Sequence, residues 1–154
     1  MTSSNRQKQC VTGPDMAAKK KAPKAEKHWH RGGCHCGAVA FEVRTADEIE
    51  LVDCNCSICR RTGYLHLIVG DKDFKLVRGQ DSLAAYTFNT GAAKHLFCKV
   101  CGIKSFYIPR SHPDGYSINF RCLDAAEFKS VVTTEFDGSH WEQNAGDLAA
   151  LESN

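Results

Sequence analysis

The sequence predicts a mostly β domain with few short helices, and three observations support this. Apolar and polar residues alternate in several short segments, turn-forming residues recur between those segments, and helical periodicity is confined to short stretches. The length of 154 residues suits one domain rather than two. We therefore expect one β-rich core with short connections.

The clearest strand signal lies at residues 39–43, where Val39, Phe41 and Val43 alternate with more polar neighbours. Further short strands are predicted at residues 49–53, 64–69, 74–77, 83–88, 95–97, 105–108 and 116–120. Short helical turns are predicted at residues 57–61 and 125–128, and a terminal helix at residues 139–150.

Residues 1–27 are predicted to form a disordered basic tail, residues 28–145 the folded domain, and residues 146–154 a C-terminal tail. The first 27 residues hold seven basic and two acidic side chains and few apolar ones. Such a segment cannot bury enough apolar surface to offset the entropy lost on ordering. A solubilising tail, a nuclear-localisation signal and a polyanion-binding segment all remain compatible with it.

Charge and hydropathy restrict the expected partners. No segment approaches the roughly 20 apolar residues that span a bilayer, so we expect an intracellular protein, cytoplasmic or nuclear, with no membrane contact. Residues 28–154 carry a formal charge of −3, which becomes −6 if seven thiolates bind two Zn²⁺ ions. Because nucleic-acid affinity depends on basic residues, binding to nucleic acid or the cytoskeleton is expected only through the basic tail.

Seven of the nine cysteines fall into three clusters with the spacing of metal ligands. The clusters are Cys34 with Cys36, then Cys54 with Cys56 and Cys59, then Cys98 with Cys101. In an extended C-x-C segment both sulfurs point to one side, so they can share an ion. The glycines that follow, Gly37 and Gly102, suit tight turns that side chains would resist. Intracellular thiols stay reduced, which favours metal binding over disulfides.

Seven sulfurs divide naturally into a closed site of four and an open site of three. Zinc takes four protein ligands in a structural site, and three with one exchangeable position in a catalytic site. We expect Cys34, Cys36, Cys98 and Cys101 to hold a structural zinc. Cys54, Cys56 and Cys59 would then hold a catalytic zinc with an open fourth position. Cys122 is an alternative fourth ligand that would close this second site, and Cys10 is expected to be a bystander.

The order of these motifs resembles the glutathione-dependent formaldehyde-activating enzyme family. The resemblance rests on G-G-C-H-C-G, C-x-C-x-x-C and C-x-x-C-G, with further similarity in the later segments, and it covers roughly residues 30–142. The matching segments are Gly32–Gly37, Cys54–Cys59, Tyr86–Thr90, Cys98–Gly102, Ser105–Tyr107 and Arg121–Asp124. Within the family, the sequence is most similar to the centromere protein V group.

The resemblance implies an Mss4-like β-rich fold with a structural zinc and a catalytic zinc. It also implies a carbon–sulfur lyase that combines glutathione with formaldehyde reversibly, giving S-hydroxymethylglutathione, with Cys54, Cys56 and Cys59 at the catalytic zinc. Two alternatives stay open. One is a lyase that acts on another small thiol adduct. The other is a non-catalytic, zinc-stabilised binding module of the centromere protein V type, which would contact chromatin or the cytoskeleton through its basic tail.

Several side chains near these motifs are candidates for handling substrate. Arginine binds carboxylates with two parallel hydrogen bonds, so cationic residues can bind an anionic thiol, although exposed solubilising charge is a competing interpretation for each. These cationic candidates are Arg60, Arg61, Lys104, Arg110 and Arg121. His66, Tyr64 and Asp53 lie close in sequence to the open site and are candidates for proton transfer, against ordinary strand packing or surface exposure.

Overall fold

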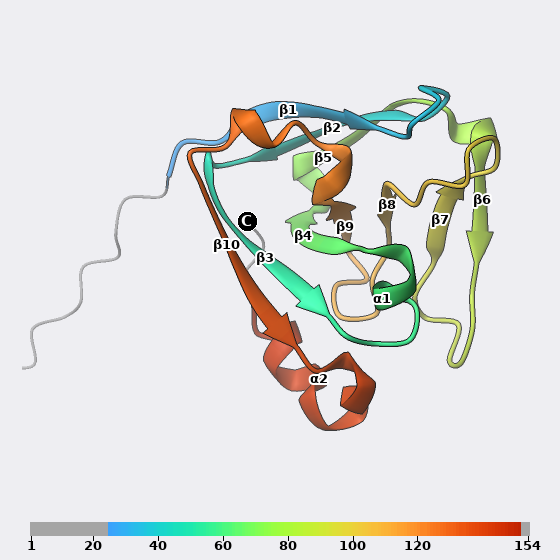
Figure 1. Ribbon diagram of the computed structural model, residues 1–154, viewed down its shortest axis with the longest axis vertical. Coiled ribbons are helices and arrows are strands. Elements are labelled where there is room, and N and C mark those ends of the chain that lie inside the picture. Colours follow the sequence, from blue (N-terminus) through green and yellow to red (C-terminus); the bar gives the residue numbers. More distant parts are fainter. Residues whose placement is uncertain (1–24, 152–154) are drawn as a thin grey trace, which may run out of the picture.

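The computed structural model describes residues 25–151, and its ten strands form three sheets (Figure 1). The strands are β1 (His28–Gly33), β2 (Ala40–Thr45), β3 (Glu48–Cys54), β4 (Leu65–Gly70), β5 (Phe74–Arg78), β6 (Leu83–Tyr86), β7 (His95–Cys98), β8 (Phe106–Tyr107), β9 (Gly115–Asn119) and β10 (Ser130–Phe136). The α-helices are α1 (Cys59–Thr62) and α2 (Trp141–Ala149), and the 3₁₀ turns are η1 (Asp71–Asp73), η2 (Gln80–Ser82), η3 (Phe120–Cys122), η4 (Ala125–Glu127) and η5 (Gly138–His140). The expected β-rich fold is confirmed.

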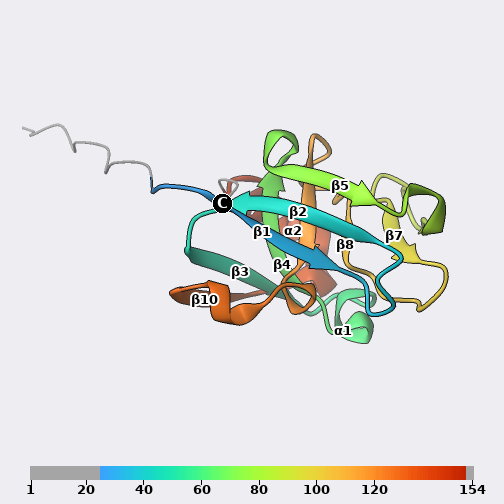
Figure 2. The same ribbon diagram turned by 90° about the horizontal axis from the view of Figure 1, so that it is seen from above.

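The sheets are built mainly from antiparallel neighbours. One sheet has the order β1-β2-β5, a larger one has the order β10-β3-β4-β9-β8, and β6 pairs with β7 as a separate hairpin. The pairing of β10 with β3 is parallel. Seen from above, the three-stranded sheet lies across the five-stranded sheet (Figure 2). This arrangement places the loop after β1 beside the turn after β7, and the loop after β3 beside the segment that follows β10.

The main core lies between the two larger sheets. Phe41 from β2 packs with apolar side chains of the five-stranded sheet, among them Leu67 and Ile118, and all three are at most 1% exposed. A smaller cluster lies on the other side of β3 and β4, where Leu148 of α2 packs against Val52 and Ile68. Since side chains alternate along a strand, Leu67 and Ile68 face opposite clusters. The strands β3 and β4 are therefore held on both faces.

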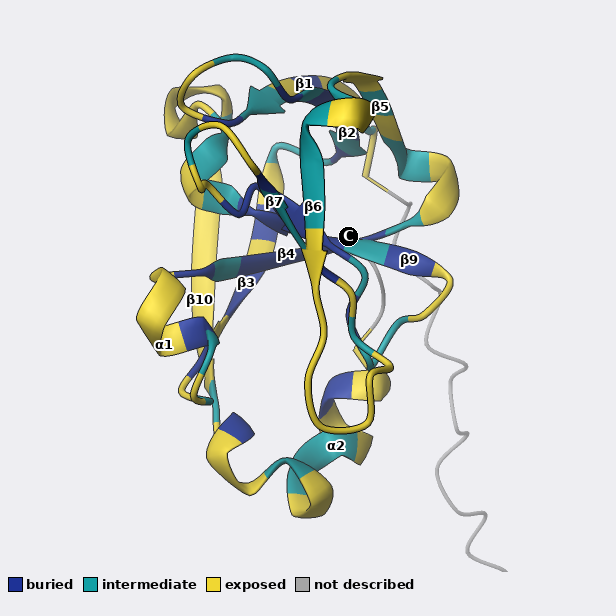
Figure 3. Ribbon diagram, turned by 90° about the vertical axis from the view of Figure 1, so that its right-hand side faces the viewer, coloured by how far each residue is buried: buried dark blue, intermediate teal, exposed yellow. Residues whose placement is uncertain are grey.

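All eight expected strands have a counterpart in the structure, and two further strands, β1 and β10, were not predicted. The strand expected at residues 83–88 ends at Tyr86, two residues early. β10 gave no alternating signal because its side chains are exposed on both faces along nearly its whole length (Figure 3). It pairs only along its edge with β3. β1 was likewise not predicted as a strand, although the folded domain was expected to begin at residue 28.

The structure describes most of the predicted C-terminal tail but only the last three residues of the predicted basic tail. Most of the predicted basic tail, residues 1–24, lies outside the described residues. At the other end, α2 spans residue 145, the expected end of the domain, and Leu148 is only 7% exposed. Within residues 25–151, no helix has the length and apolar character to cross a membrane.

Candidate metal centres and cavity

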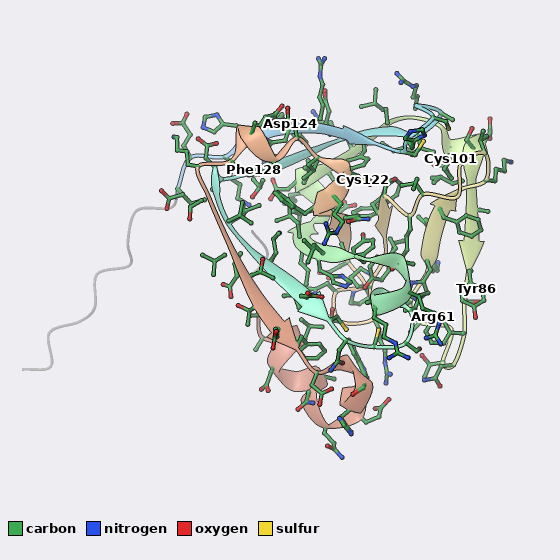
Figure 4. All side chains as sticks on the ribbon, in the orientation of Figure 1. Arg61, Tyr86, Cys101, Cys122, Asp124 and Phe128 are labelled. Carbon is green, nitrogen blue, oxygen red and sulfur yellow. The ribbon has the colours of Figure 1, made fainter. Side chains whose placement is uncertain are left out.

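Four cysteines from two distant loops form the first candidate metal centre. Cys34 and Cys36 lie between β1 and β2, Cys98 ends β7, and Cys101 follows in the next turn, beside the β1–β2 loop (Figure 4). All four sulfurs lie within 4.8 Å of one another. The cluster therefore ties the three-stranded sheet to the β6–β7 hairpin.

The spacing of these sulfurs fits a tetrahedral zinc ion. With Zn–S bonds of about 2.3 Å, the sulfurs of a tetrahedral site stand roughly 3.8 Å apart. The sulfur of Cys36 lies 3.6 Å from that of Cys34 and 3.7 Å from that of Cys98. Gly37 and Gly102 both have positive φ angles, as the turns required, and the amide of Gly102 donates to the carbonyl of Cys98 at 2.7 Å. This four-cysteine cluster can hold a metal ion of the zinc type.

Three cysteines around the end of β3 form the second candidate metal centre. Cys54 ends β3, Cys56 lies in the loop, and Cys59 begins α1. Their sulfurs also lie within 4.8 Å of one another, and no fourth cysteine, histidine or carboxylate of the described residues joins the group. We call this group the triad. Its three sulfurs fit a zinc ion that keeps one position for another ligand.

The segment between β10 and α2 is attached directly to the triad loop. The side chain of Asn55 donates to Asp137 at 3.0 Å and accepts a hydrogen bond from the amide of Ser139 at 2.9 Å. Between them lies the buried Gly138, where a Cβ atom would collide with the sulfur of Cys54 and stand 3.0 Å from the Cβ of Cys56. Glycine is required at position 138 because any side chain there would collide with the cysteines of the triad.

Crowding of the three thiols shifts their pKa values in opposite directions. A hydrogen bond from Cys54 lowers the pKa of Cys56, whereas hydrogen bonding with Cys56 raises that of Cys54, and hydrogen bonding with Cys54 and Cys56 raises that of Cys59. One sulfur thus ionises readily while its neighbours resist. A divalent cation would stabilise all three as thiolates, which is the state that metal binding requires.

Of the three candidates for proton transfer, the structure places only His66 against a triad sulfur. Its Nε2 atom lies 3.2 Å from Cys59 Sγ, and its Nδ1 atom lies 2.9 Å from Ser117 Oγ. Burial, with a smaller effect of the Lys104 charge, lowers the pKa of His66 to about 3, so the ring is neutral. The Tyr64 hydroxyl instead donates to the carbonyl of Ser117 at 2.6 Å, and Asp53 is exposed.

Lys104 is a buried cation, which contradicts the competing interpretation that it is an exposed solubilising charge. It is 7% exposed, and its Nζ atom lies 4.9 Å from the ring centre of Tyr64 and 4.0 Å from that of Tyr107. Among the described residues no carboxylate lies within ion-pairing distance of it. Burial lowers the pKa of Lys104 to about 8, and the negative charge of the triad opposes that shift. The triad is therefore its nearest source of compensating charge.

A cavity of about 620 Å³ opens beside the triad. The three cysteines line it together with polar and aromatic side chains of the β6–β7 hairpin, β8 and the start of α2. Two of the cationic candidates, Arg60 and Arg110, are at its wall, and Arg110 forms a bidentate ion pair with Glu142 at 2.9 and 3.3 Å.

The remaining two cationic candidates bind backbone carbonyls elsewhere. Arg61 donates to Ser57 and Arg121 donates to Gly63. Arg61 lies on α1, toward the side of the molecule that carries Tyr86 (Figure 4). Neither arginine lines the cavity.

Cys122 does not complete the triad. It lies on η3, under the three-stranded sheet (Figure 4). Its sulfur belongs to neither group of closely spaced ligand atoms, and burial raises the pKa of its thiol to about 11. The alternative in which Cys122 closes the second site is therefore wrong. Cys10 lies outside the described residues.

The sequence reasoning did not single out His95 or Gly138. His95 looked like an ordinary strand residue before the third cysteine cluster, and only the fold places its ring against the cavity. Gly138 carried no local signal of its own, because its role depends on a contact with residues more than eighty positions away.

Comparison with known proteins agrees with this geometry. The chain is 36% identical over 78 residues to a Halomonas elongata protein, and this match covers 46% of the chain and 50% of that protein. The name of the Halomonas elongata protein describes it, as an unproven assignment, as a glutathione-dependent formaldehyde-activating enzyme. The chain thus matches about half the length of this relative. The crystal structure of a Rhodobacter sphaeroides protein is also similar, with a TM-score of 0.57 and 38% sequence identity. This match covers 68% of the present chain and 99% of the Rhodobacter sphaeroides chain.

The match to the family profile spans both candidate metal centres and the segment between β10 and α2 that contacts the triad. It covers residues 29–138, from the start of β1 to the glycine beside Cys54. That range is well over half of the chain. The protein is therefore a member of the glutathione-dependent formaldehyde-activating enzyme family.

Proposed function

We propose that the protein is a zinc-dependent carbon–sulfur lyase acting on the adduct of formaldehyde with glutathione. The observation that carries this proposal is the triad: three sulfurs grouped at a cavity, with no fourth protein ligand among the described residues. The family and the name of the Halomonas elongata relative support glutathione and formaldehyde as the substrate pair.

Two zinc ions per chain are part of this proposal. Cys34, Cys36, Cys98 and Cys101 would hold a structural ion, and Cys54, Cys56 and Cys59 a catalytic one. A zinc ion at the triad would lower the pKa of a bound substrate thiol and keep it as a nucleophilic thiolate at neutral pH.

The protein side chains around the triad would moderate its charge. With a divalent ion bound, the three thiolates would leave a net charge of −1, and a substrate thiolate would make that charge more negative. His66 can donate a hydrogen bond from Nε2 to the Cys59 sulfur. The buried Lys104 cation lies over the ring of Tyr64, which in turn contacts the His66 ring. Both interactions favour an additional anionic sulfur, since low-dielectric surroundings strengthen them.

The cavity suits a peptide-sized thiol. Its volume of about 620 Å³ falls within the range of roughly 300–1,000 Å³ typical of small-molecule sites. Glutathione carries two carboxylates, and Arg60 and Arg110 provide cationic groups at the wall. Arg110 is already aligned by Glu142, so a substrate carboxylate would share or replace that partner.

The test combines a zinc count with turnover of the adduct. Cys56→Ser should lower zinc from two ions per chain to one, preserve the fold and reduce turnover more than a hundredfold. Cys122→Ser is the matched control because Cys122 belongs to neither ligand group, and it should keep both ions and full turnover. Unchanged turnover in the zinc-depleted Cys56→Ser protein would refute the lyase proposal.

The binding-module alternative would rely on the basic residues 1–27, most of which lie outside the described residues. Deleting residues 1–27 distinguishes the two functions. The lyase should retain turnover after the deletion, whereas a tail-dependent binding module should lose its nucleic-acid or cytoskeletal partner.

A further inference from the structure

His95, the first residue of β7, is held rigidly between aromatic rings at the cavity. It is 5% exposed, and its ring stacks on Phe88 with centroids 5.3 Å apart and on Tyr107 with centroids 5.0 Å apart. Its Nδ1 atom lies 2.7 Å from Lys104 Nζ. These contacts fix both the plane of the imidazole and the edge that faces the lysine.

The lysine contact determines which ring nitrogen carries the proton. An ammonium group has only donors, so Nδ1 of His95 must accept the hydrogen bond from Lys104. The imidazole is neutral, because burial and the lysine charge lower the pKa of His95 to about 4. A neutral imidazole that accepts at Nδ1 has its proton on Nε2.

The Nε2 atom of His95 faces the cavity. It makes no hydrogen bond to the described residues. Four polar side-chain atoms of those residues lack a hydrogen-bond partner and are also shielded from solvent, and His95 Nε2 is not one of them. Those four atoms are His30 Nε2, Thr45 Oγ1, Ser105 Oγ and Trp141 Nε1. Nε2 of His95 is therefore accessible, and the cavity that His95 lines is where it opens.

Three other ring side chains near the triad already use their polar atoms. His66 faces Cys59 with Nε2 and Ser117 with Nδ1, the Tyr64 hydroxyl donates to a backbone carbonyl, and the Tyr107 hydroxyl lies 3.5 Å from His66 Nδ1. Of the two histidines among these four rings, only His95 keeps an N–H group for a ligand.

We propose that His95 is a catalytic residue that donates a hydrogen bond from Nε2 to the adduct oxygen, and that Lys104 is the positioning residue that maintains this tautomer. The proposal rests on the lyase function proposed above and assigns the group that binds the oxygen end of its substrate.

The chemistry balances without a protein nucleophile. The thiol releases its proton to solvent when it binds as a thiolate. The sulfur lone pair then forms the C–S bond, the π pair of the aldehyde moves onto oxygen, and water returns one proton to that oxygen. The His95 N–H stabilises the negative charge while it develops, and cleavage follows the same steps in reverse. A fixed donor is effective here because it needs no reorganisation during the reaction.

The tautomer can be read directly by NMR on the full-length, zinc-loaded protein with ¹⁵N-labelled histidine. Long-range ¹H–¹⁵N correlations should show His95 protonated at Nε2 and unprotonated at Nδ1. Lys104→Met should abolish this preference, and Lys104→Arg, which keeps a cationic donor, should restore it. His28→Gln serves as the control and should leave the His95 tautomer unchanged, because His28 is an exposed residue at the start of β1. Protonation at Nδ1 in the wild-type protein would overturn the proposal.

Kinetics then test the catalytic role with two replacements of one ring. His95→Phe keeps the stacking but removes the donor, so kcat should fall roughly 10²–10³-fold while KM changes little. His95→Gln keeps an N–H near the position of Nε2 and should stay within about tenfold of wild type. Equal activity of the two variants would overturn the assignment while leaving the lyase function intact. A wild-type enzyme without turnover would instead refute the lyase function and the catalytic role, and the NMR result would still decide the Lys104–His95 relation.

Discussion

Gly138→Ala changes the geometry of the triad without removing any ligand. The added Cβ would collide with Cys54 Sγ and stand 3.0 Å from the Cβ of Cys56. Relieving that collision requires a shift on the order of 1 Å, whereas zinc ligand distances tolerate only about 0.2 Å. We therefore expect at least the 10–100-fold loss of metal affinity found for less direct disturbances of metal sites.

The same substitution should have a limited effect on the fold. Overpacking costs roughly 1–3 kcal/mol, which lowers Tm by roughly 3–12 °C for a domain of this size. The four-cysteine cluster should remain loaded, because it lies on other elements. The assay is a zinc count by elemental analysis, paired with thermal unfolding and turnover.

Gly146→Ala is the matched control, since nothing lies within 4 Å of the added methyl in α2. It should keep both zinc ions and raise stability by roughly 0.5–1 kcal/mol, as expected for replacing glycine within a helix. If Gly138→Ala retained two ions at normal affinity and wild-type turnover, the inferred close contact between Gly138 and a working metal site would be refuted.

Three further changes test other parts of the structure. Cys98→Ser should unfold the domain or lower its Tm far more than Cys56→Ser, because Cys98 is fully buried and joins two sheets; equal Tm values would contradict a structural role for the four-cysteine cluster. Arg110→Ala should raise KM for glutathione adducts severalfold but leave KM for a small thiol without carboxylates unchanged, and a parallel rise for both thiols would exclude carboxylate binding. Because the pKa of His66 is lowered to about 3, the folded protein binds fewer protons at this residue than the unfolded chain between about pH 6.5 and 3, so the contribution of His66 to stability should be constant above pH 6.5 and fall as pH decreases through that window, where His95 adds a contribution of the same sign. His66→Gln should flatten this slope in Tm measured against pH, and an identical slope would show that His66 does not contribute.

Local sequence patterns predicted most of the fold because most strands have one face in a core. Val39, Phe41 and Val43 are all at most 1% exposed, and their alternation was readable without a structure. β10 gave no such pattern, since both of its faces are exposed and it is held by an edge pairing with β3. That pairing depends on residues about eighty positions apart, which local periodicity does not report.

The division of the cysteines was predictable for a related reason. C-x-C and C-x-x-C spacings bring sulfurs together locally, so only the choice of partners between clusters required reasoning. The surroundings of the triad were less accessible. Lysine is normally exposed, and nothing in the sequence around Lys104 indicates that its ammonium group lies among the rings of Tyr64 and Tyr107. The role of His95 follows from that burial and was therefore not predicted either.

The location of the two cysteine clusters on separate elements has a practical consequence for purification. If both clusters bind an ion as proposed, the triad would hold its ion with three protein sulfurs and the other cluster with four, so a chelator would empty the triad first while the sheets stay joined at the other cluster. Such a preparation would give a normal circular dichroism spectrum and elute at the expected volume, yet be inactive. The metal content of each batch, rather than its spectroscopic appearance, is then the criterion for choosing material for kinetics.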